Sequence, residues 1–212
     1  SRFLNAPTDN DVEGEGHGFV DASVMICVDV SGSMCGKGFA AAEEAVDSFL
    51  DSVDGSGVQV GLMYFADRSC IACEPSDDYS GVVEGTRGSR GHGSGFYSRA
   101  ARSCGTCNAA DPLKEFVSWR GGFQKGDASD IVLVLTDGFW RGRACNSALK
   151  NSKSLKEDGV TIIGIGTPDA DLEFLKKIST SDSYAGLFDF SELSTAFSSI
   201  GRSISSGSGI GI

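Results

Sequence analysis

The sequence has 212 residues, of which 40% are hydrophobic and 22% charged, and its formal net charge is −11. This length fits one compact domain with some additional segments, because single cores usually cover roughly 100–250 residues. The acidic balance excludes nucleic acid as an expected partner, since phosphates are bound by Lys and Arg. No apolar run approaches the roughly 20 residues of a membrane-spanning helix, so we expect no membrane insertion. Because the sequence starts at Ser1 and not at Met, we expect a processed product or an excised fragment.

The first third of the chain alternates strand and helix patterns. Residues 1–19 are polar and acidic, and we expect an N-terminal arm there. A nearly continuous apolar run predicts a buried strand over 22–30. Apolar residues at helical spacing between 39 and 53 predict an amphipathic helix, and a second strand is expected over 58–65.

Residues 68–104 interrupt this alternation, because they are rich in Gly and Cys and include the stretch GTRGSRGHGSG. We expect a long inserted loop, with a short edge strand near Ile71 and one helical turn near Tyr79. The composition of this segment gives no regular period from which longer elements could be predicted.

The alternation resumes after residue 105. The expected elements are a helix around 113–117, a strand over 131–135, a helix over 146–156, a strand over 160–165, a helix over 172–178, a strand over 185–188 and a helix over 193–204. We expect residues 205–212 to form a flexible Gly/Ser tail. Alternating strands and helices predict an α/β domain over residues 20–204, with a doubly wound, mainly parallel sheet flanked by helices on both faces.

Oxygen-bearing side chains follow the buried strands of this predicted sheet. Asp29, Ser31 and Ser33 come directly after the first strand, Asp137 follows the strand at 131–135, and Thr106 precedes a helix between them. In doubly wound sheets the carboxyl ends of the strands form one rim, where ligands bind. Short oxygen donors suit a hard cation such as Mg²⁺. The sequence therefore predicts a divalent cation site at this rim.

Two other interpretations of the loop CVDVSGSMCGKG are weaker. A phosphate-binding loop needs G-x-x-x-x-G-K-[ST], whereas the segment from Gly32 to Lys37 is one residue short and Gly38 replaces the hydroxyl residue. A serine hydrolase needs a nucleophile elbow, which is absent, and the only histidines, His17 and His92, lie in Gly-rich segments. We therefore expect that the chain is not an enzyme.

Seven cysteines bear on the compartment and on a second metal. Cys27 lies in an apolar run and is expected to be buried. The other six lie in loop-like segments and are candidates for three disulfides in an oxidising, extracellular compartment; they are Cys35, Cys70, Cys73, Cys104, Cys107 and Cys145. The pairing is open. The alternative is zinc, because two C-x-x-C pairs are present, although their separation is longer than usual.

The segments VMICVDVSGSM, AAEEAVDSFLDSV, VQVGLMYFAD, GTCNAADPL and IVLVLTDG occur in this order. Together they resemble the von Willebrand factor type A domain over roughly residues 20–204. The resemblance implies a metal-ion-dependent adhesion site. In it Ser31, Ser33 and Thr106 are the hydroxyl ligands of the cation, and Asp29 and Asp137 act largely through water.

The resemblance also implies a function. We expect Mg²⁺, for which Mn²⁺ or Ca²⁺ could substitute, and a protein ligand that presents Asp or Glu to the cation, in the matrix or on a cell surface. Phe139, Trp140, Arg141 and Arg143 follow the last metal residue and are candidate ligand contacts. Phe139 and Trp140 could equally pack beneath the loop as core.

Two functions other than adhesion remain open from the sequence. The chain could be a structural, self-assembling module of an extracellular filament or matrix, with an incidental cation. The third alternative is an intracellular assembly factor, since the family that the chain resembles also occurs in such complexes.

Overall fold

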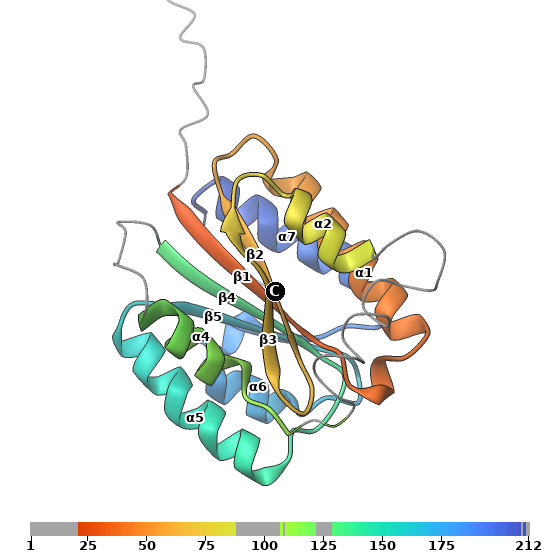
Figure 1. The fold of residues 1–212 in the computed structure, drawn as a ribbon, viewed down its shortest axis with the longest axis vertical. Coiled ribbons are helices and arrows are strands. Elements are labelled where there is room, and N and C mark those ends of the chain that lie inside the picture. The colour runs from red at the N-terminus through yellow and green to blue at the C-terminus, as the bar shows by residue number, and fades with distance from the viewer. Residues whose placement is uncertain (1–20, 88–106, 108, 122–128, 209, 211–212) are drawn as a thin grey trace, which may run out of the picture.

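A computed structural model describes residues 21–87, 107, 109–121, 129–208 and 210. Within them lies one six-stranded sheet with the order β3-β2-β1-β4-β5-β6 (Figure 1). Its strands are β1 (Ala22–Asp29), β2 (Gln59–Phe65), β3 (Ser69–Ser76), β4 (Ser129–Thr136), β5 (Thr161–Gly166) and β6 (Ala185–Leu187). All neighbouring strands are parallel except β2 and β3. The predicted mainly parallel sheet is confirmed.

Helices cover both faces of the sheet (Figure 1). One face carries α1 (Lys37–Val53), α2 (Ser80–Arg87) and α7 (Leu193–Ser205), and the other carries α4 (Pro112–Gly121), α5 (Gly142–Glu157) and α6 (Leu172–Ile178). Two short 3-10 turns, η1 (Gly32–Met34) and η2 (Asp182–Tyr184), complete the described elements. None of the helices in the described part of the chain is long and apolar enough to cross a membrane.

The side chains of β1 alternate between two hydrophobic cores. Val24, Ile26 and Val28 pack in the core beneath α1 and α7, whereas Met25 and Cys27 pack in the core beneath α4, α5 and α6. All five are fully buried, and each such side chain stabilises the fold by about 1.5–3 kcal/mol. Burial on both faces explains why this strand is a continuous apolar run, and it confirms that Cys27 is a core residue.

The largest difference from expectation lies between residues 69 and 87. A full antiparallel strand and a helix, β3 and α2, replace the short edge strand and single helical turn expected within the inserted loop. The register of β3 shifts between the pairs Leu62↔Cys73 and Met63↔Ile71. This irregularity breaks the two-residue alternation by which a strand is recognised. The rest of the expected insertion, residues 88–104, lies outside the described residues, as do residues 1–20.

The carboxyl ends of β1 and β4 lie side by side, where α1 begins (Figure 1). Val28 pairs with Leu135, which brings the last residues of the two strands opposite each other. The chain then turns through η1 to Gly36, whose φ of 81° is a conformation that non-glycine residues rarely adopt. Gly36 is the N-cap of α1, so the Gly-Lys-Gly segment is the entry to a helix.

Candidate metal centre

The loop after β1 is held by hydrogen bonds to its own side chains. Asp29 is the last residue of β1 and is fully buried, and its Oδ1 accepts a hydrogen bond of 2.9 Å from the backbone N–H of Ser31. The N–H of Met34 donates to the carbonyl of Ser31 at 3.0 Å, and the Met34 side chain is buried. The buried Met34 therefore anchors the turn that carries Ser31 and Ser33.

The end of β4 meets this loop. The Oγ of Ser33 donates to Oδ1 of Asp137 at 2.9 Å, and the hydroxyls of Ser31 and Ser33 share a hydrogen bond of 3.0 Å. Thr136, the last residue of β4, donates through Oγ1 to Oδ2 of Asp29 at 2.6 Å. Four of the five predicted metal residues therefore meet at one point of the rim, as the strand order requires.

Thr136 and Trp140 form a support for Asp29 that the sequence did not reveal. The indole Nε1 of Trp140 donates to Oγ1 of Thr136 at 3.1 Å, and Thr136 in turn donates to Asp29. The Trp140 ring lies 5.2 Å from the ring of Phe65 and 5.1 Å from that of Phe174, measured between centroids. Because the indole is fixed in the core, it also fixes the orientation of the Asp29 carboxyl. The only sequence signal was a threonine directly before Asp137.

Burial makes the two carboxyl groups costly to ionise. It raises the pKa of Asp29 to about 6, against a smaller lowering by hydrogen bonds from Thr136 and Ser31. Burial also raises the pKa of Asp137 above its ordinary value, and the hydrogen bond from Ser33 opposes this. Among the described residues, no Lys or Arg forms an ion pair with Asp137. A bound cation would relieve both costs, because it favours the charged carboxylates.

Thr106, the fifth predicted ligand, lies outside the described residues. The segment just after it is anchored to the turn that follows β2. The N–H of Cys107 donates to Oδ1 of Asp67 at 2.8 Å. The N–H groups of Ala109 and Ala110 both donate to the carbonyl of Ala66, at 3.0 and 2.9 Å. This segment thus lies at the same end of the sheet as the loop after β1.

The donor set of the described site fits a hard divalent cation. It consists of two carboxylates and two hydroxyls, from Asp29, Asp137, Ser31 and Ser33, and every donor is an oxygen atom. No group of three or more His, Cys, Asp or Glu side chains is arranged to hold a metal within the described ranges. A cation at this rim would therefore take part of its coordination from the hydroxyls and from water or an external ligand.

The candidate ligand contacts divide into two groups. Phe139 is 68% exposed, and Arg141 and Arg143 are also exposed. From the sequence, Trp140 could be either a ligand contact or a core residue. It is buried in the core. An indole in that position supports the site from beneath and cannot contact a partner.

The described cysteines form no disulfide with one another. Cys35 and Cys107 are exposed, whereas Cys145 is half-buried and donates through Sγ to the carbonyl of Trp140 at 3.0 Å. Cys70 and Cys73 both pack against the core on the α1 side of the sheet. Three disulfides among the six candidates would include at least two between described cysteines, and the described part of the chain shows none, so the disulfide prediction is not confirmed. Cys104 lies outside the described residues, and the zinc alternative remains a prediction.

Several solved structures share this fold. Proximal thread matrix protein 1 from the mussel byssus is 18% identical, with a TM-score of 0.67, over 89% of this chain and 47% of that one. A structure of the same protein "with zinc occupied MIDAS motif" is 20% identical, with a TM-score of 0.65, over 88% of this chain and 46% of that one. The chain therefore spans about half the length of these relatives.

A bacterial domain of similar length also matches. The vWF domain of the type V pili tip protein Mfa5 from Porphyromonas gingivalis is 13% identical, with a TM-score of 0.65, over 92% of this chain and 98% of that one. These identities are low, so the likeness shows the fold alone. A comparison with curated proteins finds no match.

Family-level comparison of the sequence agrees with the fold. Two models described as von Willebrand factor type A domain match the chain, one over residues 24–139 and the other over residues 107–200. The first covers more than half of the chain and includes both the loop after β1 and the end of β4. The chain belongs to the von Willebrand factor type A domain family.

Proposed function

We propose that this domain binds one divalent cation at the rim and, through it, an acidic group of a protein ligand. The cation is Mg²⁺, for which Mn²⁺ or Ca²⁺ can substitute. Ser31, Ser33 and Thr106 supply hydroxyl oxygens, and Asp29 and Asp137 supply carboxylates that act largely through water. An Asp or Glu side chain of the ligand completes the coordination. This is a binding role, with no catalytic step.

The observation that carries the proposal is the meeting of the two serines with Asp137. Ser33 contacts both Ser31 and Asp137 through hydroxyl hydrogen bonds, although 104 positions separate Ser33 from Asp137 in the sequence. Because the two carboxylates act largely through water, a bound divalent cation keeps coordination positions open in the direction of solvent. Such a cation attracts a carboxylate from a partner.

Two further observations support a role outside the cell. Proteins that share this fold include a byssus matrix protein and a pilus tip protein. The six cysteines other than Cys27 are numerous enough for three disulfides. We therefore propose an extracellular or surface location, with a matrix or surface protein as ligand. Mass spectrometry of the unreduced protein tests this, since finding all seven cysteines reduced would favour an intracellular assembly factor.

The test of the cation-dependent role compares binding in Mg²⁺ and in EDTA. Immobilised wild-type domain is exposed to matrix or surface extract, and bound proteins are identified in both conditions. Asp137→Ala should lose the same proteins that EDTA releases. Asp51→Ala is the matched control, because this exposed carboxylate lies near the far end of α1, about 20 Å along the helix from the rim. Retention of the partner by Asp137→Ala, or in EDTA, would refute the mechanism.

A structural, self-assembling module is the second candidate, favoured by the likeness to a byssus matrix protein. In that role the fold is a building block and the cation is incidental. Sedimentation analysis separates the two proposals. Tight self-association that is equal in Mg²⁺ and in EDTA, together with no cation-dependent partner, would replace adhesion by assembly.

A further inference from the structure

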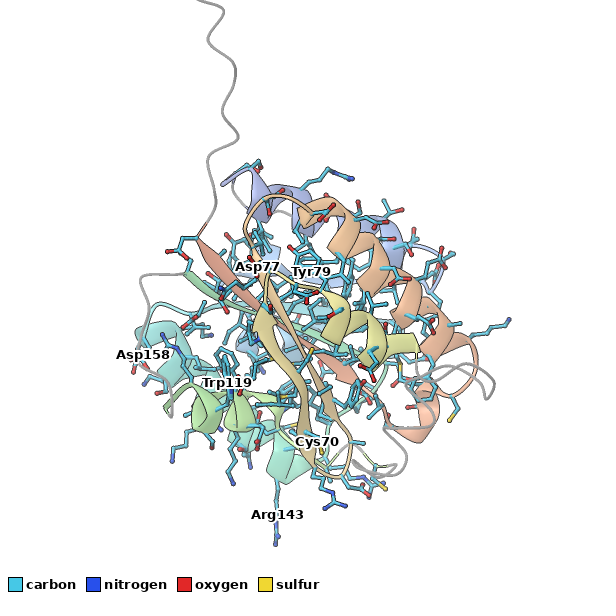
Figure 2. The ribbon with its side chains drawn as sticks, turned by 45° about the horizontal axis from the view of Figure 1, so that its top comes forward. Cys70, Asp77, Tyr79, Trp119, Arg143 and Asp158 are labelled. Carbon is cyan, nitrogen blue, oxygen red and sulfur yellow. The ribbon has the colours of Figure 1, made fainter. Side chains whose placement is uncertain are left out.

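A pocket of about 380 Å³ lies at the same end of the sheet as the proposed metal site. Its walls come from the turn after β2, from the segment at 109–110, and from the first turns of α4 and α5. Three cationic side chains line it, each from a different element: Arg68, Lys114 and Arg143. We call this cavity the basic pocket. Arg143 projects from the end of α5 that lies toward Cys70 of β3 (Figure 2).

The cations of the basic pocket are available to a ligand. Arg68, Lys114 and Arg143 are exposed, and none of them forms an ion pair with another described residue. The chain as a whole is strongly acidic, so three such cations around one cavity are a local reversal of its charge. An anion that enters the pocket gains Coulombic attraction from all three.

The two carboxylates of the pocket are not equivalent. Asp111 is buried, and its oxygens already accept hydrogen bonds from the Leu113 N–H at 3.0 Å, the Ser147 hydroxyl at 2.7 Å and the Asn151 amide at 2.8 Å. These bonds tie the segment that leads into α4 to α5. Glu115 is the remaining acid. Three cations thus face two carboxylates, one of which is engaged in the fold.

The basic pocket and the metal loop are attached to the same strand end. The N–H of Val30, in the metal loop, donates to the carbonyl of Phe65 at 2.9 Å. The next carbonyl, that of Ala66, accepts from Ala109 and Ala110 in the pocket wall. On the other side, the first turn of α5 carries Arg143 only six positions after Asp137. The pocket therefore lies at the same end of the sheet as the proposed cation site and is joined to it through the turn after β2.

We infer that the basic pocket binds a second acidic side chain of the same protein ligand whose first carboxylate reaches the cation. This inference rests on the proposed function, because it assumes that an acidic group is held at the metal. Arginine binds carboxylates in a planar, two-point geometry, and the N-terminal end of α5 adds a favourable dipole. The ligand would present two acids a few residues apart, and their spacing would select the partner.

The test uses capped Gly/Ser peptides in Mg²⁺. One peptide carries a single Asp, and the others add a Glu about two to six residues away, which covers the reach of a short extended segment. Titration of the wild-type domain should show a gain of about five- to tenfold in affinity for one spacing. The double variant Arg68→Ala/Lys114→Ala should lose this gain while it binds the one-acid peptide as wild type does.

Two control variants each remove one exposed cationic side chain that lies outside the basic pocket. Lys150→Ala changes α5 outside the pocket, and Arg202→Ala changes α7 on the other face of the sheet. Both should keep the full gain from the second acid. Equal affinity of wild type for one-acid and two-acid peptides at every spacing would overturn the inference and leave cation-dependent binding intact. Persistence of the gain in the double variant would also overturn it.

A measurement in EDTA separates this inference from the proposed function. Acetate is titrated against chloride at constant ionic strength, and amide NMR signals of Ala110 and Ala144, both in the pocket wall, are followed. Saturable shifts that vanish in Arg68→Ala/Lys114→Ala support the pocket even where the peptides show no dependence on Mg²⁺. Shifts that are absent, or equal in the double variant, overturn the pocket, whatever the metal site does.

Discussion

The two ends of β4 each carry an aspartate, and their surroundings differ. Asp130, near the amino end, forms an ion pair of 2.5 Å with Nε of Arg120, whose Nη1 also lies 3.6 Å from Asp158. Asp137, just past the carboxyl end, accepts a hydrogen bond from a neutral hydroxyl of Ser33. The aspartate at the amino end thus has an arginine of the fold as its counter-ion. The aspartate at the carboxyl end is placed to bind a cation from solution.

This difference separates structural from functional carboxylates in one strand. The charge of Asp130 is compensated by a side chain of the fold, so its loss should reduce stability. The charge of Asp137 costs energy in the absence of a cation, since burial raises its pKa. Its loss should therefore reduce binding while the fold persists. The following predictions test this contrast.

The largest effect is expected from Asp137→Asn. Removal of this carboxylate should lower cation affinity about 100-fold or more, and the rise in Tm that Mg²⁺ produces in wild type should disappear. The metal-free variant should be as stable as wild type, because an amide is not penalised for burial as a charge is. Isothermal titration with Mn²⁺ and thermal unfolding with and without Mg²⁺ measure both quantities. Unchanged cation affinity would remove Asp137 from the site.

The second-largest effect should be the pH dependence of cation affinity. Because the pKa of Asp29 is raised from 3.8 to about 6 in the fold, protonation favours the folded, metal-free state. Its contribution to stability is complete below pH 3.8 and is lost as the pH rises through about 6. Protons also compete with the cation, so cation affinity should fall about tenfold between pH 7 and pH 5. Affinity that is constant across this range would contradict the assignment of Asp29.

Thr136→Val should produce a smaller loss. The substitution keeps the shape of the side chain but removes the hydroxyl that donates to Asp29 and accepts from Trp140. We expect cation affinity about tenfold weaker and stability lower by about 1 kcal/mol. Thr136→Ser should restore most of the affinity, because it keeps the hydroxyl. Equal affinity in the valine and serine variants would show that the hydrogen bond does not position Asp29.

Asp130→Asn should show the smallest effect on cation binding. Its effect should be confined to the stability of the fold. The side chains of Arg120 and Asp130 are only 16% and 24% exposed, so the lost charge should lower the free energy of unfolding by about 1 kcal/mol. Arg120 retains Asp158 as a partner, which limits the loss. Urea denaturation measures the stability. Cation affinity should equal that of wild type, and a weakened affinity would break the contrast between the two ends of the strand.

Much of this arrangement could be predicted from the sequence, since it depends on local patterns. The apolar runs before Asp29 and Asp137 identify buried parallel strands, and the topology of such sheets brings their carboxyl ends together. The roles of Thr136 and Trp140 could not be predicted in the same way. Trp140 is fixed by Phe65 and Phe174, which are distant in the sequence. The residues that follow it, Arg141 and Gly142, suggest an exposed loop.

The strand β3 was underestimated for a different physical reason. Its residues are mostly half-buried, and its register shift near Ala72 interrupts the alternation of apolar and polar side chains. An edge strand of this kind has no strong periodic signal. The basic pocket was equally hidden, because Arg68, Lys114 and Arg143 come from three separate segments and meet only in the fold.

The most direct test of the central claim is to locate a bound cation by paramagnetic NMR. Mn²⁺ is added in small amounts to the labelled domain, and the amide signals that broaden first are those nearest the ion. We predict that Ser31, Ser33 and Asp137 broaden first, that excess Mg²⁺ restores them, and that Asp130 at the other end of β4 stays sharp. Broadening centred away from the rim, or none at all, would contradict the account.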